Sequence, residues 1–271
     1  MIPAGGRCLT KGKHVEKPQL IRGIEEMSIT AWPSFQHIFM DGWVLRFAAG
    51  YTFRSNSVQP IYSGSEDVAE KIRRCEDLYS RHGLPTAFKI SPIVQPPGLD
   101  LILESQGYRM HTPTSAQVLD ALPERSVCID DEGARCVSLS EWLDAFSIIS
   151  ALPAEKKPFH AGIAERIPLP ICTMTLDYGG QPAACGLGVL HGDYFGIYDI
   201  CTAPSMRQMG LGTRIMQGLL GWASDAGATS AYVTVVEENA PAIGMYRKLG
   251  FRHLYSYWYR MKDEFVRPLD Q

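Results

Sequence analysis

The stretch Arg207-Gln208-Met209-Gly210-Leu211-Gly212-Thr213 decides how this chain is expected to fold. It follows an apolar run over residues 194–202, which predicts a strand, and it precedes a helical pattern of apolar residues. Glycine lacks a Cβ atom, so the backbone at Gly210 and Gly212 can adopt a positive φ and approach a ligand closely. The first N–H groups of a helix have no partner within the helix and lie at the positive end of its dipole. The stretch therefore predicts a phosphate site at a strand–turn–helix junction, with Arg207 adding positive charge.

The same stretch also fits an ordinary strand-to-helix turn, because short glycine motifs match often by chance. It contains neither the Gly-Lys-Thr/Ser of a Walker loop nor a GxGxxG fingerprint. A second stretch, Asn239 to Phe251, adds independent information. Asn239 is a suitable N-cap, Pro241 suits the first helical turn, and Gly250 is placed to end the helix.

Together the two stretches resemble the signatures of the GCN5-related N-acetyltransferase (GNAT) superfamily. The pyrophosphate signature of that family, Gln/Arg-x-x-Gly-x-Gly/Ala, is matched by Arg207, Gly210 and Gly212. A later signature, Asn-x-x-Ala-x-x-x-Tyr followed by Gly-Phe, is matched by Asn239, Ala242, Tyr246, Gly250 and Phe251. The close resemblance covers roughly residues 170–260. It implies an α/β fold in which a mixed, mostly antiparallel twisted sheet is flanked by helices.

The resemblance also implies a reaction, the transfer of an acetyl group from acetyl-CoA to a primary amine by direct attack. N–H groups of Met209 to Thr213 are expected to bind the CoA pyrophosphate, and Tyr246 is expected to protonate the departing thiolate. The backbone at the end of the preceding strand is expected to hold the pantetheine arm and polarise the thioester. The complete expected binding set is Cys201, Thr202, Arg207, Gln208, Met209, Gly210, Leu211, Gly212, Thr213, Asn239, Ala242 and Tyr246.

The sequence leaves the general base open. Asp199 lies within an apolar run, where burying a carboxylate is costly unless the group is paired or has a role. We therefore rank it first among the candidate bases. Glu237 and Glu238 follow the next predicted strand, and each of the three also fits a solvated surface carboxylate. Tyr246 likewise fits a packing aromatic on an amphipathic helix. A covalent mechanism through Cys201 lacks a supporting constellation of His with Asn or Asp.

The composition is that of an ordinary folded protein and excludes several other classes. The chain has 271 residues, of which 45% are hydrophobic and 20% charged, with a net charge of -3. No basic excess points to nucleic acid or a membrane surface, no apolar run is long enough to span a membrane, and the first residues lack the core of a secretion signal. Seven cysteines without a Cys-x-x-Cys argue against a disulfide framework or a zinc site. We therefore expect a cytoplasmic monomer or homodimer that needs no metal and acts on a small-molecule or peptide amine.

An order of helix, glycine, strand, helix and Gly-aromatic occurs twice, from Gly83 to Gly107 and from Gly227 to Gly250. It predicts an internal repeat, with coincidence in an α/β chain as the alternative. The first copy has no Arg-x-x-Gly-x-Gly, and Leu103 occupies the place of Tyr246. The expected organisation is a tail (1–20), a degenerate GNAT-like module (21–120), a linker (121–132) and a catalytic domain (133–271). The polar stretch from Pro113 to Glu132 as a whole is interpreted as the linker region.

Four local predictions are also made. They are a helix from Gly23 to Phe39 interrupted at Trp32-Pro33, a strand from Tyr51 to Arg54, an N-cap at Ser140, and an irregular segment over 153–170. In the family, the region corresponding to that segment shapes the acceptor pocket. A non-catalytic acyl-CoA-binding or sensing protein is the alternative function, and an enzyme that uses a longer acyl donor is a third.

Overall fold

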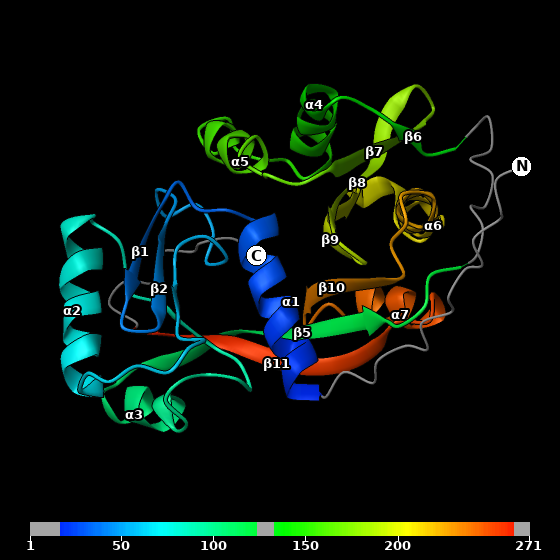
Figure 1. The fold of residues 1–271 in the computed structure, drawn as a ribbon. Helices are drawn as coiled ribbons and strands as arrows, with labels where there is room; N and C mark the ends of the chain where they lie inside the picture. Colours follow the sequence, from blue (N-terminus) through cyan, green and yellow to red (C-terminus); the bar gives the residue numbers. More distant parts are fainter. Residues whose placement is uncertain (1–16, 124–132, 263–271) are drawn as a thin grey trace, which may run out of the picture.

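The computed structural model describes residues 17–123 and 133–262 (Figure 1). Its strands are β1 (Gln36–Met40), β2 (Trp43–Phe47), β3 (Val58–Gln59), β4 (Phe88–Ile90), β5 (Arg109–Leu119), β6 (Arg135–Cys136), β7 (Ile171–Tyr178), β8 (Gln181–His191), β9 (Tyr194–Thr202), β10 (Ser230–Val236) and β11 (Arg252–Met261). Its helices are α1 (Lys17–Ala31), α2 (Val68–Arg81), α3 (Leu99–Ser105), α4 (Leu139–Ile149), α5 (Lys157–Ala164), the short 3-10 turn η1 (Pro204–Met206), α6 (Leu211–Asp225) and α7 (Ala240–Lys248).

All these strands form one 11-stranded sheet in the order β1-β2-β3-β4-β11-β5-β10-β9-β8-β7-β6. Only the pairs β3–β4 and β9–β10 are parallel among the described strands. The predicted fold class, a mixed and mostly antiparallel sheet flanked by helices, is therefore confirmed. No helix in residues 17–123 or 133–262 is long and apolar enough to cross a bilayer.

The two halves of the sheet end in exchanged strands. Strand β5 follows α3 in the first half, yet it pairs with β10 of the second half over Thr114–Leu119. Strand β11 follows α7 in the second half, yet it pairs with β4 of the first half through Trp258, Tyr259 and Arg260. The two exchanged strands also pair with each other, and they cross the middle of the molecule side by side (Figure 1). Each half of the sheet is thus completed by the other half of the chain.

The internal repeat appears in the backbone as two matching helix ends. At α7, Gly250 has a φ of 91° and the N–H of Phe251 donates to the carbonyl of Tyr246 at 3.0 Å. At α3, Gly107 has a φ of 85° and the N–H of Tyr108 donates to the carbonyl of Leu103 at 3.0 Å. This is the Schellman ending, which needs a left-handed residue after the last helical turn. Leu103 and Tyr246 therefore occupy equivalent places, as the sequence predicts.

Helices cover both faces of the sheet and enclose three apolar clusters. Helices α1, α4 and α5 pack on one face against β8 and β9 around Trp142 and Leu187. Helices α6 and α7 pack on the opposite face, around Ile215 and Val233. Helices α2 and α3 cover the strands β1 to β4 of the first half, around Phe88. Figure 1 shows α1 crossing in front of β5 and β11, where it spans both halves of the sheet.

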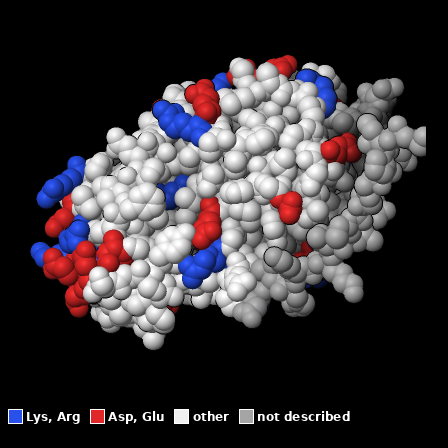
Figure 2. All heavy atoms as spheres, in the orientation of Figure 1, with Lys and Arg blue, Asp and Glu red and all other residues white. Residues whose placement is uncertain are grey.

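Charged side chains are mixed in sign on the face seen in Figure 2. Several lie over α2, where Arg73 and Arg74 pair with Glu70 and Glu66. That face carries no continuous basic patch, in keeping with the net charge of -3.

Several local predictions are wrong. Residues 36–40 form β1 instead of the second part of a helix, because the hairpin at Asp41-Gly42 pairs them with β2. Residues 51–54 form turns instead of a strand. Residues 113–119 lie in β5 instead of a linker, because β10 and β11 pair with them on both sides. Ser138, not Ser140, caps α4 through a capping box with Glu141, and the segment 153–170 contains α5.

The expected domain boundaries stay predictions. Much of the expected tail and linker lies outside the described residues, while Lys17 to Leu20 belong to α1.

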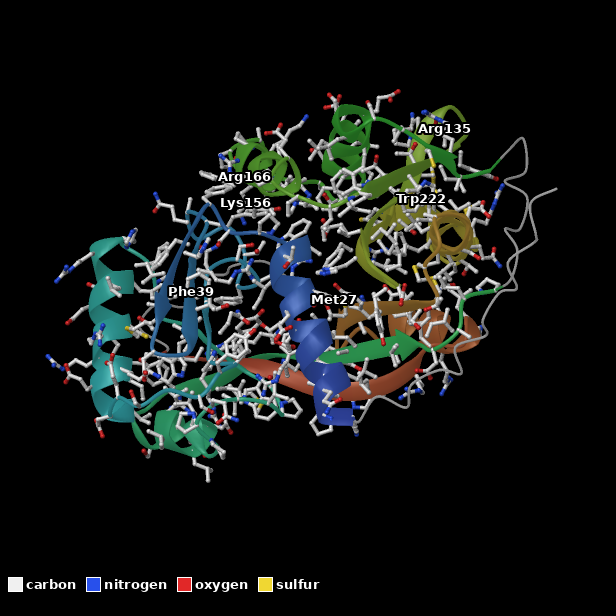
Figure 3. All side chains as sticks on the ribbon, viewed as in Figure 1. Met27, Phe39, Arg135, Lys156, Arg166 and Trp222 are labelled. Atoms are coloured by element: carbon white, nitrogen blue, oxygen red, sulfur yellow. The ribbon has the colours of Figure 1, made fainter. Side chains whose placement is uncertain are left out.

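Gly188 on β8 leaves room for an aromatic ring that fixes α6 against the sheet. A Cβ at Gly188 would lie 1.8 Å from Cζ of Phe195, whose side chain is fully buried. The Phe195 ring in turn contacts Trp222 of α6 at a centroid distance of 5.7 Å, and Figure 3 shows Trp222 beside that helix. Any side chain on residue 188 must therefore displace Phe195.

Replacing Gly188 by alanine is expected to lower the free energy of unfolding by about 1–3 kcal/mol, because overpacking displaces a ring that has no free space to enter. Gly23→Ala is the matched control: it lies within α1, a Cβ there meets nothing within 4 Å, and alanine favours a helix. Urea unfolding of both variants measures the difference. Equal stability of the two variants would contradict the packing described for Phe195.

Candidate active site

A gap opens in the sheet where β9 and β10 part. The two strands pair in parallel from Tyr194 with Ser230 to Ile197 with Val233. Beyond that point β10 continues to pair with β5, while β9 continues along β8. The register on β8 shifts between Cys185 and Leu187, a β-bulge in which two residues of β9 lie opposite one of β8. Asp199 lies in this bulge with a φ of 50°, an uncommon value for a residue other than glycine.

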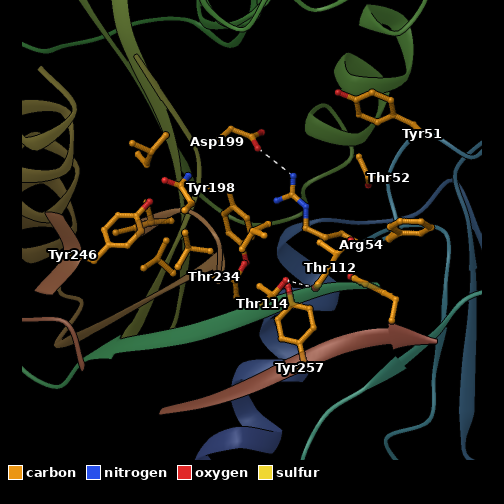
Figure 4. Close-up of a pocket in the computed structure, with 18 residues that line it drawn as sticks. Tyr51, Thr52, Arg54, Thr112, Thr114, Tyr198, Asp199, Thr234, Tyr246 and Tyr257 are labelled. Carbon is orange, nitrogen blue, oxygen red and sulfur yellow. Dashed lines mark hydrogen bonds and ion pairs between the residues drawn. The ribbon is translucent and has the colours of Figure 1, made fainter. Parts of the chain in front are cut away.

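A cavity of about 330 Å³ occupies this gap (Figure 4). Both halves of the chain line it. The second half supplies Ile197, Tyr198, Asp199, Ile200, Val233, Thr234, Val235, Val236, Asn239 and Tyr246. The first half supplies Tyr51, Thr52, Phe53 and Arg54, and the exchanged strands β5 and β11 supply Thr112, Thr114, Tyr257 and Tyr259.

Tyr246 points into the cavity from α7 (Figure 4). Its side chain is 5% exposed, and the Schellman ending at Gly250 fixes the turn of helix that carries it. Burial raises the pKa of Tyr246 to about 12, so the hydroxyl stays protonated at neutral pH. Asn239, at the start of the same helix, also lines the cavity. Its side chain accepts a hydrogen bond from the N–H of Ala242 at 3.2 Å, which confirms the predicted N-cap.

The stretch 207–213 lies at the surface where β9 ends and α6 begins. Gly210 has a φ of 79° and precedes the first helical residue, Leu211. The N–H of Arg214 donates to the carbonyl of Gly210, so the N–H groups of residues 211–213 come before the first such bond of the helix. A Cβ on Gly210 would meet nothing within 4 Å, so its surface is open to a ligand. The predicted turn and helix start are therefore present.

Gly212 holds this turn close to the two other predicted donor-binding segments. A Cβ at Gly212 would lie 3.2 Å from Oγ1 of Thr202 and 3.5 Å from Sδ of Met245. The end of β9, with Cys201 and Thr202, therefore meets the start of α6 and the middle of α7. The cavity itself reaches along β9 only to Ile200, so residues 201–213 lie beside it and do not line it.

Asp199 takes part in a chain of polar contacts that the sequence did not predict. Its Oδ1 accepts a hydrogen bond from Nη2 of Arg54 at 3.2 Å, drawn as a dashed line in Figure 4. Its Oδ2 lies 3.4 Å from Nε2 of His160, and Nδ1 of His160 lies 2.8 Å from the hydroxyl of Tyr51. Burial lowers the pKa of His160 more than the nearby carboxylate raises it, so the imidazole is neutral at neutral pH.

Sequence reasoning missed Tyr51, Arg54 and His160, which come from the turn after β2 and from α5. No local motif marks them, because Arg54 and Asp199 are separated by 145 positions along the chain. Residues 153–170 are expected to shape the acceptor pocket. His160 of this segment contacts Asp199, but it does not line the cavity. Of the other base candidates, Glu237 accepts a hydrogen bond from Ser256 on an exposed edge and does not line the cavity, and neither does Glu238.

Two sequence families match the chain. Residues 137–251 match the family described as "Acetyltransferase (GNAT) family", and residues 19–118 match the one described as "Probable histone acetyltransferase Rv0428c C-terminal". The chain is also similar to the "Uncharacterized N-acetyltransferase YobR" of Bacillus subtilis (strain 168), with 29% identity over 251 residues, covering 89% of this chain and 98% of the relative.

Solved structures with a similar fold include two proteins that are described as GNAT proteins. A GCN5-related N-acetyltransferase from Kribbella flavida has a TM-score of 0.70 and 15% identity, with 89% of this chain and 95% of that chain covered. A tandem GNAT protein from the clavulanic acid biosynthesis pathway has a TM-score of 0.56 and 13% identity, with 88% of this chain and 87% of that chain covered. These likenesses extend over both halves of the sheet.

Proposed function

Because this chain is an N-acetyltransferase with a GNAT-family domain at residues 137–251, we propose that it uses acetyl-CoA to acetylate a primary amine in the cavity between β9 and β10. The observation that carries this proposal is that Asp199 and Tyr246 line one cavity, at the point where the two strands part. An acid and a base are thereby held on either side of a space for the reacting atoms.

The donor is proposed to bind from the surface inward. The N–H groups of Met209 to Thr213 and the charge of Arg207 bind the pyrophosphate at the start of α6. The end of β9, at Cys201 and Thr202, pairs with the pantetheine arm, with Gln208, Asn239 and Ala242 beside it. The thioester then lies in the gap near the bulge at Asp199, because the backbone there has no partner on β10.

The acceptor enters from the side of the cavity that the first half builds. Its ammonium group is attracted to Asp199 and loses one proton to solvent before attack. Asp199 then accepts the second proton, which the nitrogen loses as it bonds to the thioester carbon. The amine nitrogen forms a bond to the thioester carbon while the carbon–sulfur bond breaks. Tyr246 gives its hydroxyl proton to the departing sulfur and regains one from solvent.

The first half is proposed to be a degenerate module that walls the acceptor site. Leu103 replaces Tyr246 at the equivalent helix position and has no proton to give. The segment between β3 and α2 has no glycine-rich helix start, and Asp67 caps α2 in its place. A non-catalytic acyl-CoA-binding protein is not favoured, because an acid and a base share the cavity and the curated relative is named an N-acetyltransferase.

Calorimetric titration of the purified chain with acetyl-CoA tests the donor site. We expect one molecule bound per chain, since only the second half has the glycine-rich start of a helix. Two molecules bound per chain would contradict the proposal that the first half is a degenerate module without a donor site. The absence of binding would overturn the proposed function itself.

A further inference from the structure

One wall of the cavity is built by the first half of the chain together with Tyr257 and Tyr259 of β11. This wall holds more buried positive charge than negative charge. A second, small cavity of about 20 Å³ adjoins the first, and Arg54, Tyr257 and Tyr259 line both. Lys89, which lines the small cavity, pairs with buried Glu25 at 2.7 Å, and Arg54 pairs with Asp199.

Arg46 also lines the small cavity and is 3% exposed. Its guanidinium donates to the backbone carbonyls of Ile29, Trp32 and Arg54, and no carboxylate pairs with it over the described residues. Burial lowers the pKa of Arg46 to about 10, so it is still charged at neutral pH. One buried cation is therefore left without an anion. Because a buried charge is costly unless it is paired, this wall favours an anionic ligand.

Two fully buried hydroxyl groups of residues that line the main cavity have no hydrogen-bond partner among the described residues. They are the Tyr259 hydroxyl and Oγ1 of Thr52, and both residues line the main cavity. Tyr259 is 3% exposed, and burial raises the pKa of its hydroxyl well above the ordinary value, so the group is a donor. One guanidinium nitrogen of Arg54 donates a hydrogen bond to Asp199. The Arg54 side chain is 32% exposed and lies beside these hydroxyls. Buried polar groups are normally paired, so unpaired donors beside a guanidinium indicate a place for an acceptor of hydrogen bonds.

The Arg54–Asp199 pair offers opposite charges to the cavity side by side. Nη2 of Arg54 lies 3.2 Å from Oδ1 of Asp199, and Oδ2 of Asp199 lies 3.4 Å from Nε2 of His160. A ligand with an ammonium group next to a carboxylate matches this pattern with the charges reversed. Its carboxylate would meet the guanidinium, and its ammonium would meet the carboxylate of Asp199, which lines the cavity.

We propose that the acceptor is a small α- or β-amino acid, whose carboxylate is bound by Arg54 and the Tyr259 hydroxyl and whose amine is held at Asp199. This proposal rests on the proposed function and names its substrate class. The bonds and protons balance as described above: the ammonium group loses one proton to solvent, the attacking nitrogen loses a second at Asp199, and the carboxylate is unchanged. A bidentate guanidinium–carboxylate contact fixes the orientation of the amine toward the thioester.

The same wall disfavours two other acceptor classes. Polyamines would place further ammonium groups beside Arg54, Arg46 and Lys89, where the carboxylates of Asp199 and Glu25 already pair with Arg54 and Lys89. Protein tails are poorly matched in size, because the 330 Å³ cavity lies near the lower end of the roughly 300–1,000 Å³ range of small-molecule pockets. Part of that volume must also hold the acetyl end of the donor.

An acceptor panel tests the proposal in the full chain. Release of CoA thiol is measured with acetyl-CoA and α-amino acids or β-alanine, each compared with its primary amide and its decarboxylated amine. We expect kcat/KM to be at least about tenfold higher for the amino acids, because neither analogue brings a negative charge to Arg54.

Two variants locate the carboxylate. Tyr259→Phe removes the unpaired hydroxyl and keeps the ring, so KM for the best amino acid should rise severalfold and by a larger factor than KM for its amide. Arg54→Gln should abolish the preference for the amino acid over its amide. Tyr178→Phe, in an exposed position at the end of β7, is the control and should change neither value. Calorimetric binding of acetyl-CoA by each variant shows that the donor site is intact.

Several outcomes overturn the amino-acid assignment. Equal kcat/KM for the amino acids and their amides, or turnover of peptides or polyamines alone, would do so and leave the acetyltransferase function standing. Binding of acetyl-CoA without turnover of any amino acid would also overturn it. A failure to bind acetyl-CoA would instead remove the proposed function on which it rests.

Discussion

Replacing Tyr246 by phenylalanine is expected to lower kcat about 10²–10⁴-fold, the range in which a positioned proton donor contributes. The change keeps the ring that packs against Phe251 and removes only the hydroxyl that lines the cavity. Because burial holds the pKa of Tyr246 near 12, the group is protonated throughout the neutral range and serves as an acid. Steady-state release of CoA thiol measures the loss.

The donor site should be unaffected by this change. Calorimetry should give the same affinity for acetyl-CoA in Tyr246→Phe and in the unchanged protein, since the cradle at the start of α6 is intact. Tyr178→Phe is again the control, and its turnover should match that of the unchanged protein. Turnover of Tyr246→Phe at the same level as this control would sink the assignment of the acid.

The second large effect is expected from Asp199→Asn. The amide keeps the shape and can still accept a hydrogen bond from Arg54, but it cannot take up the proton that the attacking nitrogen loses. We expect turnover to fall about 10²–10⁴-fold, with a higher KM for the acceptor and unchanged binding of acetyl-CoA. The pH at which the amine itself ionises should then govern the residual rate.

This variant should also lose stability, because Arg54 is left without its anion in a wall that already holds the unpaired charge of Arg46. Removing one partner of a fully buried pair costs about 3–5 kcal/mol, and the 32% exposure of Arg54 reduces this to about 1–3 kcal/mol. Asp120→Asn, which breaks the exposed pair with Arg252, is the matched control and should cost under about 1 kcal/mol. Equal losses in urea unfolding would contradict the buried charge balance described here.

Local sequence signals predicted the donor side of the site well. The Schellman glycine at Gly250, the N-cap at Asn239 and the turn at Gly210 each depend on a few neighbouring residues, and the structure has all three. The GNAT resemblance drawn from the motifs is confirmed by the matching families and folds. The role of each binding residue in holding CoA stays a prediction.

The acceptor side could not be predicted in the same way. Arg54, His160 and Asp199 come together only because the first half packs over the gap between β9 and β10, and no spacing in the sequence encodes that contact. The strand β5 was missed because Pro113 and nearby polar residues are typical of a loop, whereas pairing on both sides holds them extended. Tertiary pairing here overrides local preference.

The exchanged strands set the order in which this chain can mature during synthesis. Strand β4 gains its neighbour β11 only when residues near the very end of the described chain have left the ribosome. Until then the first half carries an open sheet edge, and β5 must wait for both β10 and β11. Such distant pairings are slow to form. The first half is therefore expected to be a late-folding part of a newly made chain, although it is translated first.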